Sequence, residues 1–169
     1  VSDCTPPPAD QQQRYNGQSW KWNAAEGTLE RVQTDLMSKR NVHFVLDCNF
    51  CAPGTPVHMW PVDPQWKENQ VFSYNHTTGQ FVSTAHKTCL AATSSAAEMA
   101  QCNESDVQQQ WDIVPLPSEQ SGNVGWVQLR RQEKHEWKDT QSDTKCLTTP
   151  FYGESVTYGP TITESDGVD

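Results

Sequence analysis

Residues Val45–Phe72 read VLDCNFCAPGTPVHMWPVDPQWKENQVF, and this stretch decides the expected fold. A short apolar run ends at Asp47, the loop-forming residues APGTP follow, and the segment VHMW then closes at Trp60. Apolar segments separated by Gly and Pro are typical of short strands joined by tight loops. The stretch therefore predicts a strand pair that brings Asp47 near Trp60, with Asn69 following just before the next strand.

The same stretch carries four side chains of different chemistry: Asp47, His58, Trp60 and Asn69. An indole packs against the apolar face of a sugar ring, and a carboxylate accepts strong hydrogen bonds from hydroxyl groups. A side-chain amide both donates and accepts hydrogen bonds. Together the four residues predict a sugar-binding site. Taken singly, Asp47 and Asn69 fit turn positions and Trp60 fits a half-buried core position.

The composition favours a loop-rich all-β domain with a small core. The chain has 169 residues, which suits a single domain. Only 34% of the residues are hydrophobic, but seven Trp, five Phe and four Tyr argue against disorder. No long stretch shows the 3.6-residue apolar periodicity of a helix.

The charge balance disfavours two classes of partner. There are 12 Lys and Arg against 21 Asp and Glu, which gives a net charge of −9. Nucleic acids and anionic membrane surfaces both require clustered basic residues. No apolar run approaches the roughly 18 residues of a membrane span. We therefore expect neither nucleic-acid binding nor a transmembrane segment.

Cysteine usage and glycosylation motifs indicate a secreted glycoprotein. The six cysteines are Cys4, Cys48, Cys51, Cys89, Cys102 and Cys146. An even number in a loop-rich chain is typical of disulfides in an oxidising compartment. The two N-glycosylation motifs, at Asn75 and Asn103, point to the same compartment.

Catalysis and metal binding find little support in the sequence. Its five His residues have no paired nucleophile, and no Gly-x-Ser-x-Gly or phosphate-loop pattern occurs. A zinc site made of Cys48, Cys51, His43 and His58 would have no familiar ligand spacing, so disulfides are favoured. We expect a protein that is not an enzyme and uses no cofactor or metal.

A repeat runs through the chain. A Gln stands two residues before a large aromatic residue in Gln18-Ser19-Trp20, Gln70-Val71-Phe72 and Gln109-Gln110-Trp111. Similar apolar triplets also recur, at Val45-Leu46-Asp47, Cys89-Leu90-Ala91 and Cys146-Leu147-Thr148. The pattern predicts a strand–turn–strand unit of about 40–50 residues. Three copies of a four-strand unit give the strand count of a β-trefoil.

On these motifs the chain resembles the ricin B-type lectin family, which is marked by three Gln-x-Trp motifs. Asn69–Tyr74 and Lys145–Thr149 are especially typical pieces. The resemblance covers roughly residues 18–160, between a lead-in at 1–17 and an acidic tail at 161–169. It implies an all-β fold, a β-trefoil of three four-stranded lobes with pseudo-threefold symmetry.

The third lobe departs from the family pattern because no Gln-x-aromatic strand follows Cys146. The N-terminal Gln18-Ser19-Trp20 strand could close the trefoil, with a Cys4–Cys146 disulfide across the join. The alternative is a truncated or processed third lobe. The resemblance also implies a Cys89–Cys102 disulfide in the middle lobe. Sequence alone leaves three pairings open for the other four cysteines.

Residue by residue, the resemblance places the sugar-binding groups at Asp47, Trp60 and Asn69, with His58 at a position that often forms hydrogen bonds. The middle lobe has Ala91, Ala100 and Gln108 instead, and the third has Thr148 and Gly159 at the first two positions. The family implies one competent site, in the first lobe, for galactose or N-acetylgalactosamine. If His58 contacts the sugar, affinity should change between about pH 5 and 7.

An alternative function belongs to another class. The chain could be a structural or adaptor subunit of an extracellular or toxin-like assembly that uses the same scaffold to bind protein chains. The segment from Ser118 to Thr144, with Trp126 or Trp137, and the acidic tail would then make the contacts. The loss of two of the three sites favours this alternative, whereas retention of Asp47, Trp60 and Asn69 together favours the lectin.

Overall fold

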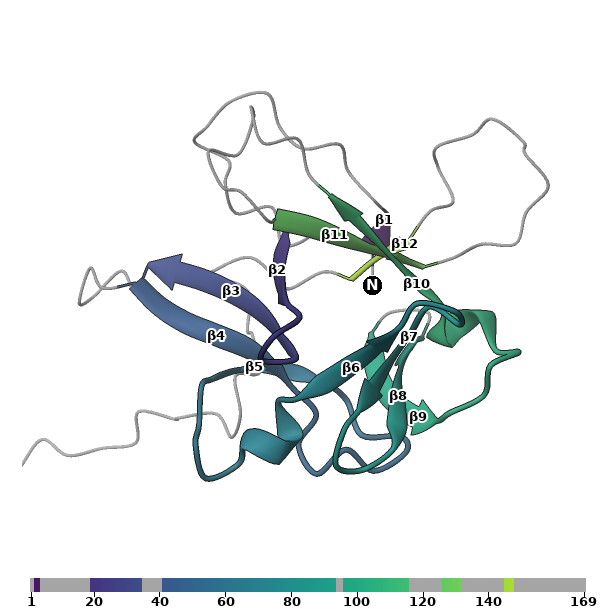
Figure 1. The fold of residues 1–169 in the computed structure, drawn as a ribbon, viewed down its shortest axis with the longest axis horizontal. Helices are drawn as coiled ribbons and strands as arrows, with labels where there is room; N and C mark the ends of the chain where they lie inside the picture. The colour runs from purple at the N-terminus through teal and green to yellow at the C-terminus, as the bar shows by residue number, and fades with distance from the viewer. Residues whose placement is uncertain are drawn as a thin grey trace, which may run out of the picture.

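The computed structural model describes residues 2–3, 19–34, 41–93, 96–115, 126–131 and 145–147. Figure 1 shows short strands in these ranges, with two one-turn 3-10 helices. The strands are β1 (Ser2–Asp3), β2 (Trp20–Asn23), β3 (Thr28–Thr34), β4 (Asn41–Asp47), β5 (His58–Pro61), β6 (Phe72–Asn75), β7 (Gln80–Ser83), β8 (Thr88–Ala92), β9 (Ala97–Gln101), β10 (Trp111–Pro115), β11 (Trp126–Arg131) and β12 (Lys145–Cys146). The helices are η2 (Lys67–Asn69) and η3 (Val107–Gln109). The predicted all-β class is confirmed.

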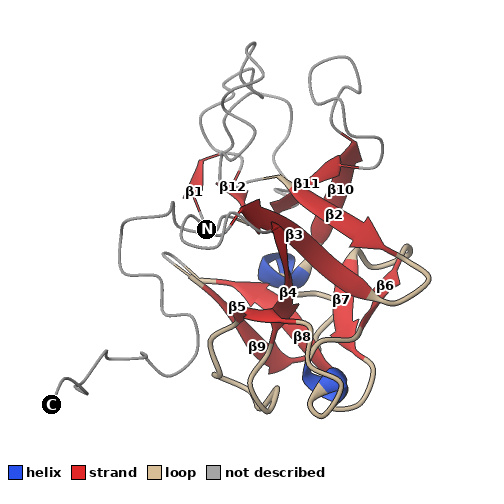
Figure 2. Ribbon diagram, turned by 90° about the vertical axis from the view of Figure 1, so that its left-hand side faces the viewer, coloured by secondary structure: helices blue, strands red, loops and turns tan. Residues whose placement is uncertain are grey.

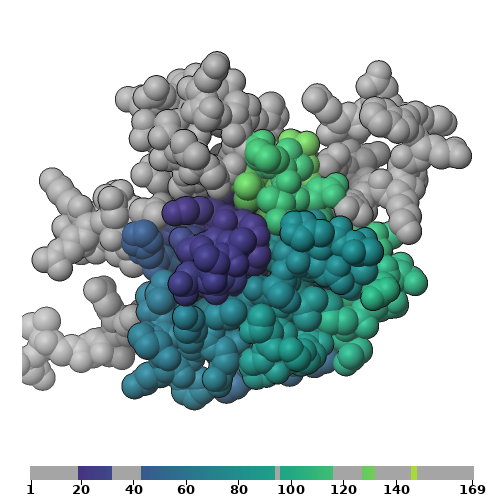
Figure 3. Space-filling view, in the orientation of Figure 1, coloured from purple at the N-terminus to yellow at the C-terminus, as the bar shows by residue number. Residues whose placement is uncertain are grey.

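The strands form two antiparallel sheets. The larger has the order β1-β12-β11-β2-β3-β4-β5, with β10 also paired to β11, and the smaller has the order β6-β7-β8-β9. Backbone hydrogen bonds join the sheets: Phe72 donates to the Gly27 carbonyl and Trp111 donates to the Gly79 carbonyl. In Figure 3 the purple residues of β2 and β3 accordingly lie against the teal residues of the smaller sheet.

Two glycines shape equivalent hairpin turns. Gly27 (φ 72°) donates to the Asn23 carbonyl, and Gly79 (φ 73°) donates to the Asn75 carbonyl. A left-handed backbone of this kind favours glycine, because a Cβ would crowd the following carbonyl. At Gly27 a Cβ would also lie 2.5 Å from the carbonyl oxygen of Phe72. A steric requirement therefore explains the glycine that lies seven residues after the aromatic residue of each of the first two motifs.

The aromatic residues of the three motifs form the centre of the core. Trp20, Phe72 and Trp111 are each at most 2% exposed. The leucines of the repeated apolar triplets are buried with them: Leu46, Leu90 and Leu147. The indole N–H groups of both Trp residues donate to leucine carbonyls, Trp20 to Leu147 (3.0 Å) and Trp111 to Leu90 (2.9 Å). Trp111, Leu90 and Leu147 therefore belong to the hydrophobic core.

Two N-terminal strands pair with the C-terminal part of the described chain. β2 pairs with β11, and β1 pairs with β12 in the register Ser2↔Cys146. Figure 2 shows β1 and β12 side by side. Pairing by the Gln-x-Trp strand agrees with the expected closure, whereas β1 was not predicted. Cys146 is disulfide-bonded, but Cys4, its expected partner, lies outside the described residues.

Part of the segment from Ser118 to Thr144 belongs to the core. β11 pairs with β10, β12 and β2, and its Gln128 and Leu129 are fully buried. Residues 126–131, in the segment that the alternative function assigns to partner contacts, are therefore part of the larger sheet. Trp137, Thr148, Gly159 and the acidic tail lie outside the described residues. Within the described ranges, no helix is long and apolar enough to cross a membrane.

Candidate functional site

A hollow of about 580 Å³ lies beside the β4–β5 pair and the loops that flank it. Its lining includes all four side chains that the sequence singled out: Asp47, His58, Trp60 and Asn69. The pairing register explains this arrangement. Asp47 lies opposite His58 and Val45 lies opposite Trp60, so alternate residues of β5 face the same side.

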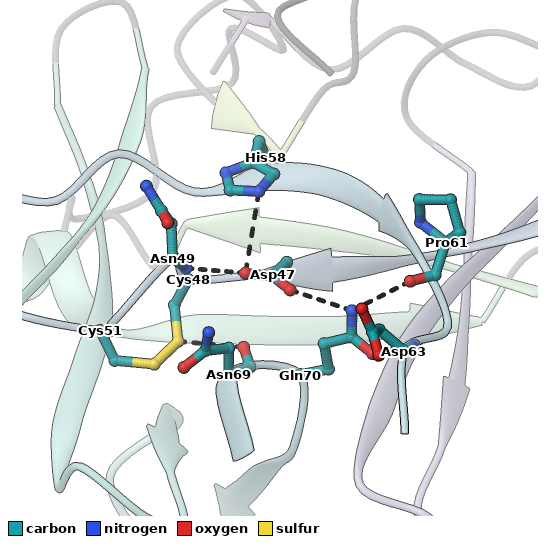
Figure 4. Close-up of polar contacts among 9 residues, drawn as sticks. All are labelled: Asp47, Cys48, Asn49, Cys51, His58, Pro61, Asp63, Asn69 and Gln70. Carbon is teal, nitrogen blue, oxygen red and sulfur yellow. Dashed lines mark hydrogen bonds and ion pairs between the residues drawn. A yellow bond between two sulfur atoms is a disulfide. The ribbon is translucent and has the colours of Figure 1, made fainter. Parts of the chain in front are cut away.

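Asp47 is held in place by hydrogen bonds to both of its carboxylate oxygens (Figure 4). The backbone N–H of Asn49 donates to Oδ1 (2.7 Å), and the side chain of Gln70 donates to Oδ2 (2.9 Å). His58 Nε2 lies 3.7 Å from Oδ1. Each carboxylate oxygen can accept more than one hydrogen bond, so this buried, fixed group keeps acceptor capacity for a ligand hydroxyl.

Gln70 connects this carboxylate to the repeated sequence motif. Its Oε1 accepts from the backbone N–H of Asp63 (3.1 Å), and its Nε2 also donates to the Pro61 carbonyl (3.1 Å). Gln109 of the next motif makes the matching pair of bonds, from Asn103 N–H and to the Gln101 carbonyl, both 2.9 Å. Each glutamine side chain thus bonds both to the last residue of the preceding strand and to the loop that follows it. Gln70 also orients Asp47.

Asn69 contributes a side chain without an internal partner. The residue is 7% exposed, and its backbone is fixed: its N–H donates to the Trp66 carbonyl and its carbonyl accepts from Cys48 N–H. Within the part of the chain that the structure describes, its side-chain amide forms no hydrogen bond. Asn69 lines the hollow, so this amide can donate hydrogen bonds to a ligand there and accept them from it.

His58 packs edge-to-face against Trp60, with ring centroids 5.8 Å apart and an interplanar angle of 82°. Burial lowers the pKa of His58 below its usual value, and the nearby Asp47 carboxylate opposes this shift. The imidazole is therefore neutral at pH 7, with one nitrogen that donates and one that accepts.

The loop between β4 and β5 is closed by a disulfide between Cys48 and Cys51. This finding resolves one of the pairings that the sequence left open, and it removes the thiolates that a zinc site would need. Asn49, Phe50 and Cys51 all have positive φ, at 40°, 73° and 52°. A left-handed backbone costs about 1–2 kcal/mol for each such residue. Strained backbone of this kind is concentrated at functional sites.

Sequence reasoning missed six lining residues: Asn49, Phe50, Pro56, Val57, Asp63 and Trp66. Phe50 and Trp66 are 66% and 49% exposed, and their ring centroids lie 6.4 Å apart. The sequence contained only a weak indication that Phe50 and Trp66 are not core residues. Phe50 stands between two cysteines, and Trp66 is surrounded by polar residues, so neither belongs to an apolar run.

The smaller sheet has the same strand register with different side chains. Ala91 lies opposite Glu98 and Cys89 lies opposite Ala100, just as Asp47 lies opposite His58 and Val45 opposite Trp60. Ala91 and Ala100 thus take the places of Asp47 and Trp60. These two positions therefore carry neither a carboxylate nor an indole, and Glu98 stands at the place of His58.

The structure also describes the predicted disulfide and the two glycosylation candidates. Cys89 and Cys102 form the disulfide that the resemblance implied. Asn75 and Asn103, the two glycosylation candidates, are exposed at turns, where each side chain accepts a backbone N–H two residues on. Among the described residues, no group of three or more His, Cys, Asp or Glu side chains is placed to hold a metal ion.

Comparison of the chain with protein-family models and with curated proteins finds no match in either set.

Proposed function

We propose that this chain is a secreted carbohydrate-binding module with a β-trefoil fold similar to that of ricin B-type lectins. Its single competent site would be the hollow at β4–β5, and its ligand a sugar of the galactose or N-acetylgalactosamine type. The observation that carries the proposal is one juxtaposition. A fixed carboxylate (Asp47), an indole (Trp60) and an amide without a partner (Asn69) line the same hollow.

The strand register supports the trefoil. β2–β5 and β6–β9 are two successive four-strand sets, and β10, β11, β12 and β1 give a third. The second strand of each set has a fully buried residue at the matching position: Leu29, Phe81 and Leu129. The residue after it pairs with the third strand in each case, as Glu30↔Val45, Val82↔Cys89 and Arg130↔Cys146.

The chemistry of the hollow fits a neutral sugar. Hydroxyl groups can donate to Asp47, the amide of Asn69 can donate and accept, and a C–H face can pack on Trp60. The described lining contains two carboxylates, Asp47 and Asp63, and no Lys or Arg. An acidic sugar would meet like charge there, which is unfavourable.

The disulfides support an oxidising compartment. Cys48–Cys51 and Cys89–Cys102 are paired, and Cys146 is also disulfide-bonded. The exposed positions of Asn75 and Asn103 are compatible with glycosylation in the same compartment. Glycans on a cell surface or in a matrix are then the accessible ligands.

A single shallow site should bind a monosaccharide with a Kd on the order of 0.1–1 mM, about 4–5.5 kcal/mol. Stronger binding would require clustered sugars or several linked copies of the site, because a second contact then becomes intramolecular.

The proposal is tested by titrating galactose, N-acetylgalactosamine, glucose and galacturonate, followed by Trp fluorescence and calorimetry. We expect saturable binding of the first two, weaker binding of galacturonate, and loss of binding in Asp47→Asn and Asn69→Ala. Gln108→Ala is the matched control, since it changes an exposed amide in the smaller sheet's helical turn. Absence of a response to these sugars and to a glycan array would overturn the proposed function.

A further inference from the structure

The hollow has a second aromatic surface that the four candidate residues do not use. Phe50 and Trp66 meet edge-to-face at an interplanar angle of 74° and are both well exposed. Large aromatic side chains gain free energy from burial and are unfavourable in water. Exposed aromatic residues that line a cavity are therefore candidates for ligand contact.

Both aromatic residues are rigidly connected to the proposed sugar contacts. Phe50 lies three residues after Asp47, in the disulfide-closed loop with positive φ, and Trp66 lies three residues before Asn69. The Trp66 carbonyl accepts from Asn69 N–H (2.9 Å). The Cys48 N–H donates to the Asn69 carbonyl (3.0 Å), which ties the two loops together. The aromatic pair and the sugar contacts are thus parts of one fixed framework.

The size of the hollow also exceeds the needs of one sugar ring. Its volume of about 580 Å³ lies within the range of roughly 300–1,000 Å³ that holds drug-sized ligands. A single hexose is smaller than such ligands. The lining therefore has room, and an apolar surface, for a second ring beside the one on Trp60.

We infer that the natural ligand is an extended, uncharged oligosaccharide: a terminal ring contacts Asp47, Trp60 and Asn69, and the adjoining ring packs on Phe50 and Trp66. This inference rests on the proposed function and adds the ligand's length. Each sugar ring presents apolar C–H groups to one aromatic surface. The carboxylates of Asp47 and Asp63 exclude acidic substituents from both positions.

The test compares binding of methyl β-galactoside with binding of lactose, N-acetyllactosamine and galactosyl-β1,3-N-acetylgalactosamine by calorimetry. For the wild type, we expect at least one disaccharide to bind about 3- to 10-fold more tightly than the monosaccharide. Phe50→Ala and Trp66→Ala should lose this gain and keep the affinity for methyl β-galactoside. Phe50→Tyr, which retains the ring, should preserve it.

Val107→Ala is the control, because Val107 is an exposed apolar residue on η3 that does not line the hollow. Equal affinity for the monosaccharide and all disaccharides would overturn the inference and leave the proposed function intact. So would a gain that survives both aromatic substitutions. Binding of no saccharide would overturn both. Dimers in the wild type that dissociate in Phe50→Ala, seen by sedimentation without any disaccharide gain, would assign the surface to a second copy instead.

Discussion

Gln70 Nε2 lies 2.9 Å from Asp47 Oδ2, and this buried hydrogen bond links the repeated Gln-x-aromatic motif to the candidate sugar site. In both copies the glutamine fixes a loop through backbone hydrogen bonds, and in the first copy it also donates to Asp47. In the second copy, Gln109 lies 3.2 Å from Asp106, a residue of its own turn, and has Ala91 at the place of Asp47. Comparison of Gln70 with Gln109 therefore distinguishes the structural role of the motif glutamine from its proposed role in orienting Asp47.

Substituting Gln70 should reduce both stability and sugar affinity. Gln70→Ala removes three hydrogen bonds at a residue that is 2% exposed, and it leaves buried partners unsatisfied. We expect a loss of about 1–3 kcal/mol in the free energy of unfolding, measured with urea. Galactose affinity should also fall, because Asp47 loses the donor that orients it.

Gln109→Ala provides the matched control for this prediction. Gln109 is equally buried and makes the corresponding hydrogen bonds. Its substitution should cost a similar amount of stability and leave galactose affinity unchanged. Equal losses of affinity in both variants would mean that Gln70 acts on binding only through overall stability.

Acidification should weaken both folding and sugar binding through His58. Its pKa is lowered in the folded state, mainly by burial, so the folded protein favours the neutral imidazole. A lowered pKa contributes stability that is present above the unfolded value of about 6.5 and is lost as pH falls through the folded pKa. Protonation also removes the acceptor nitrogen that a sugar hydroxyl could use.

The measurement is urea unfolding and galactose titration between about pH 5 and 7.5. His58→Asn should flatten the pH dependence of both quantities. His86→Asn replaces an exposed histidine outside the lining and should leave the profile of the wild type. A wild-type affinity that stays constant over this range would remove His58 from the sugar contacts.

The strand-based part of the site could be predicted from sequence, because side chains alternate with a period of two along a strand. That rule puts His58 and Trp60 on one face, and the turn residues between 52 and 56 return the chain to Asp47. The aromatic residue of each motif was recognisable from its repeated position two residues after a Gln. A residue's type and spacing are sufficient where a regular element determines its direction.

The loop-based part could not be predicted. Phe50 reaches the hollow through three successive residues with positive φ, and none of them is a glycine that would signal such a backbone. Four cysteines allowed three pairings, and the Cys48–Cys51 closure was only one of them. β1 has two residues, too few for any apolar pattern, and its pairing with β12 depends on the whole fold.

Two glycines in left-handed turns should differ in their tolerance of a side chain. Gly54→Ala (φ 83°) meets no atom within 4 Å, so its cost is the backbone strain alone, about 1–2 kcal/mol. Gly27→Ala has similar strain and also places its Cβ 2.5 Å from the Phe72 carbonyl oxygen. We expect a clearly larger loss of unfolding free energy for Gly27→Ala. Equal losses in urea unfolding would mean that β2–β3 and β6 separate without cost.

Removal of Cys89–Cys102 and removal of Cys48–Cys51 should affect different properties. Cys89–Cys102 spans 13 residues, so its loss should lower stability by about 2–4 kcal/mol and leave sugar affinity unchanged, because neither residue lines the hollow. Cys48–Cys51 spans only three residues, and a short loop contributes less stability.

Replacing both Cys48 and Cys51 with Ser should nevertheless weaken galactose binding. Without the bridge, Asn49 and Phe50 can leave their strained positive φ, and the Asn49 N–H then no longer holds Asp47. Calorimetry with galactose and urea unfolding on the two double variants measure both effects. Unchanged galactose affinity in the Cys48/Cys51 variant would show that Gln70 alone is sufficient to orient the carboxylate.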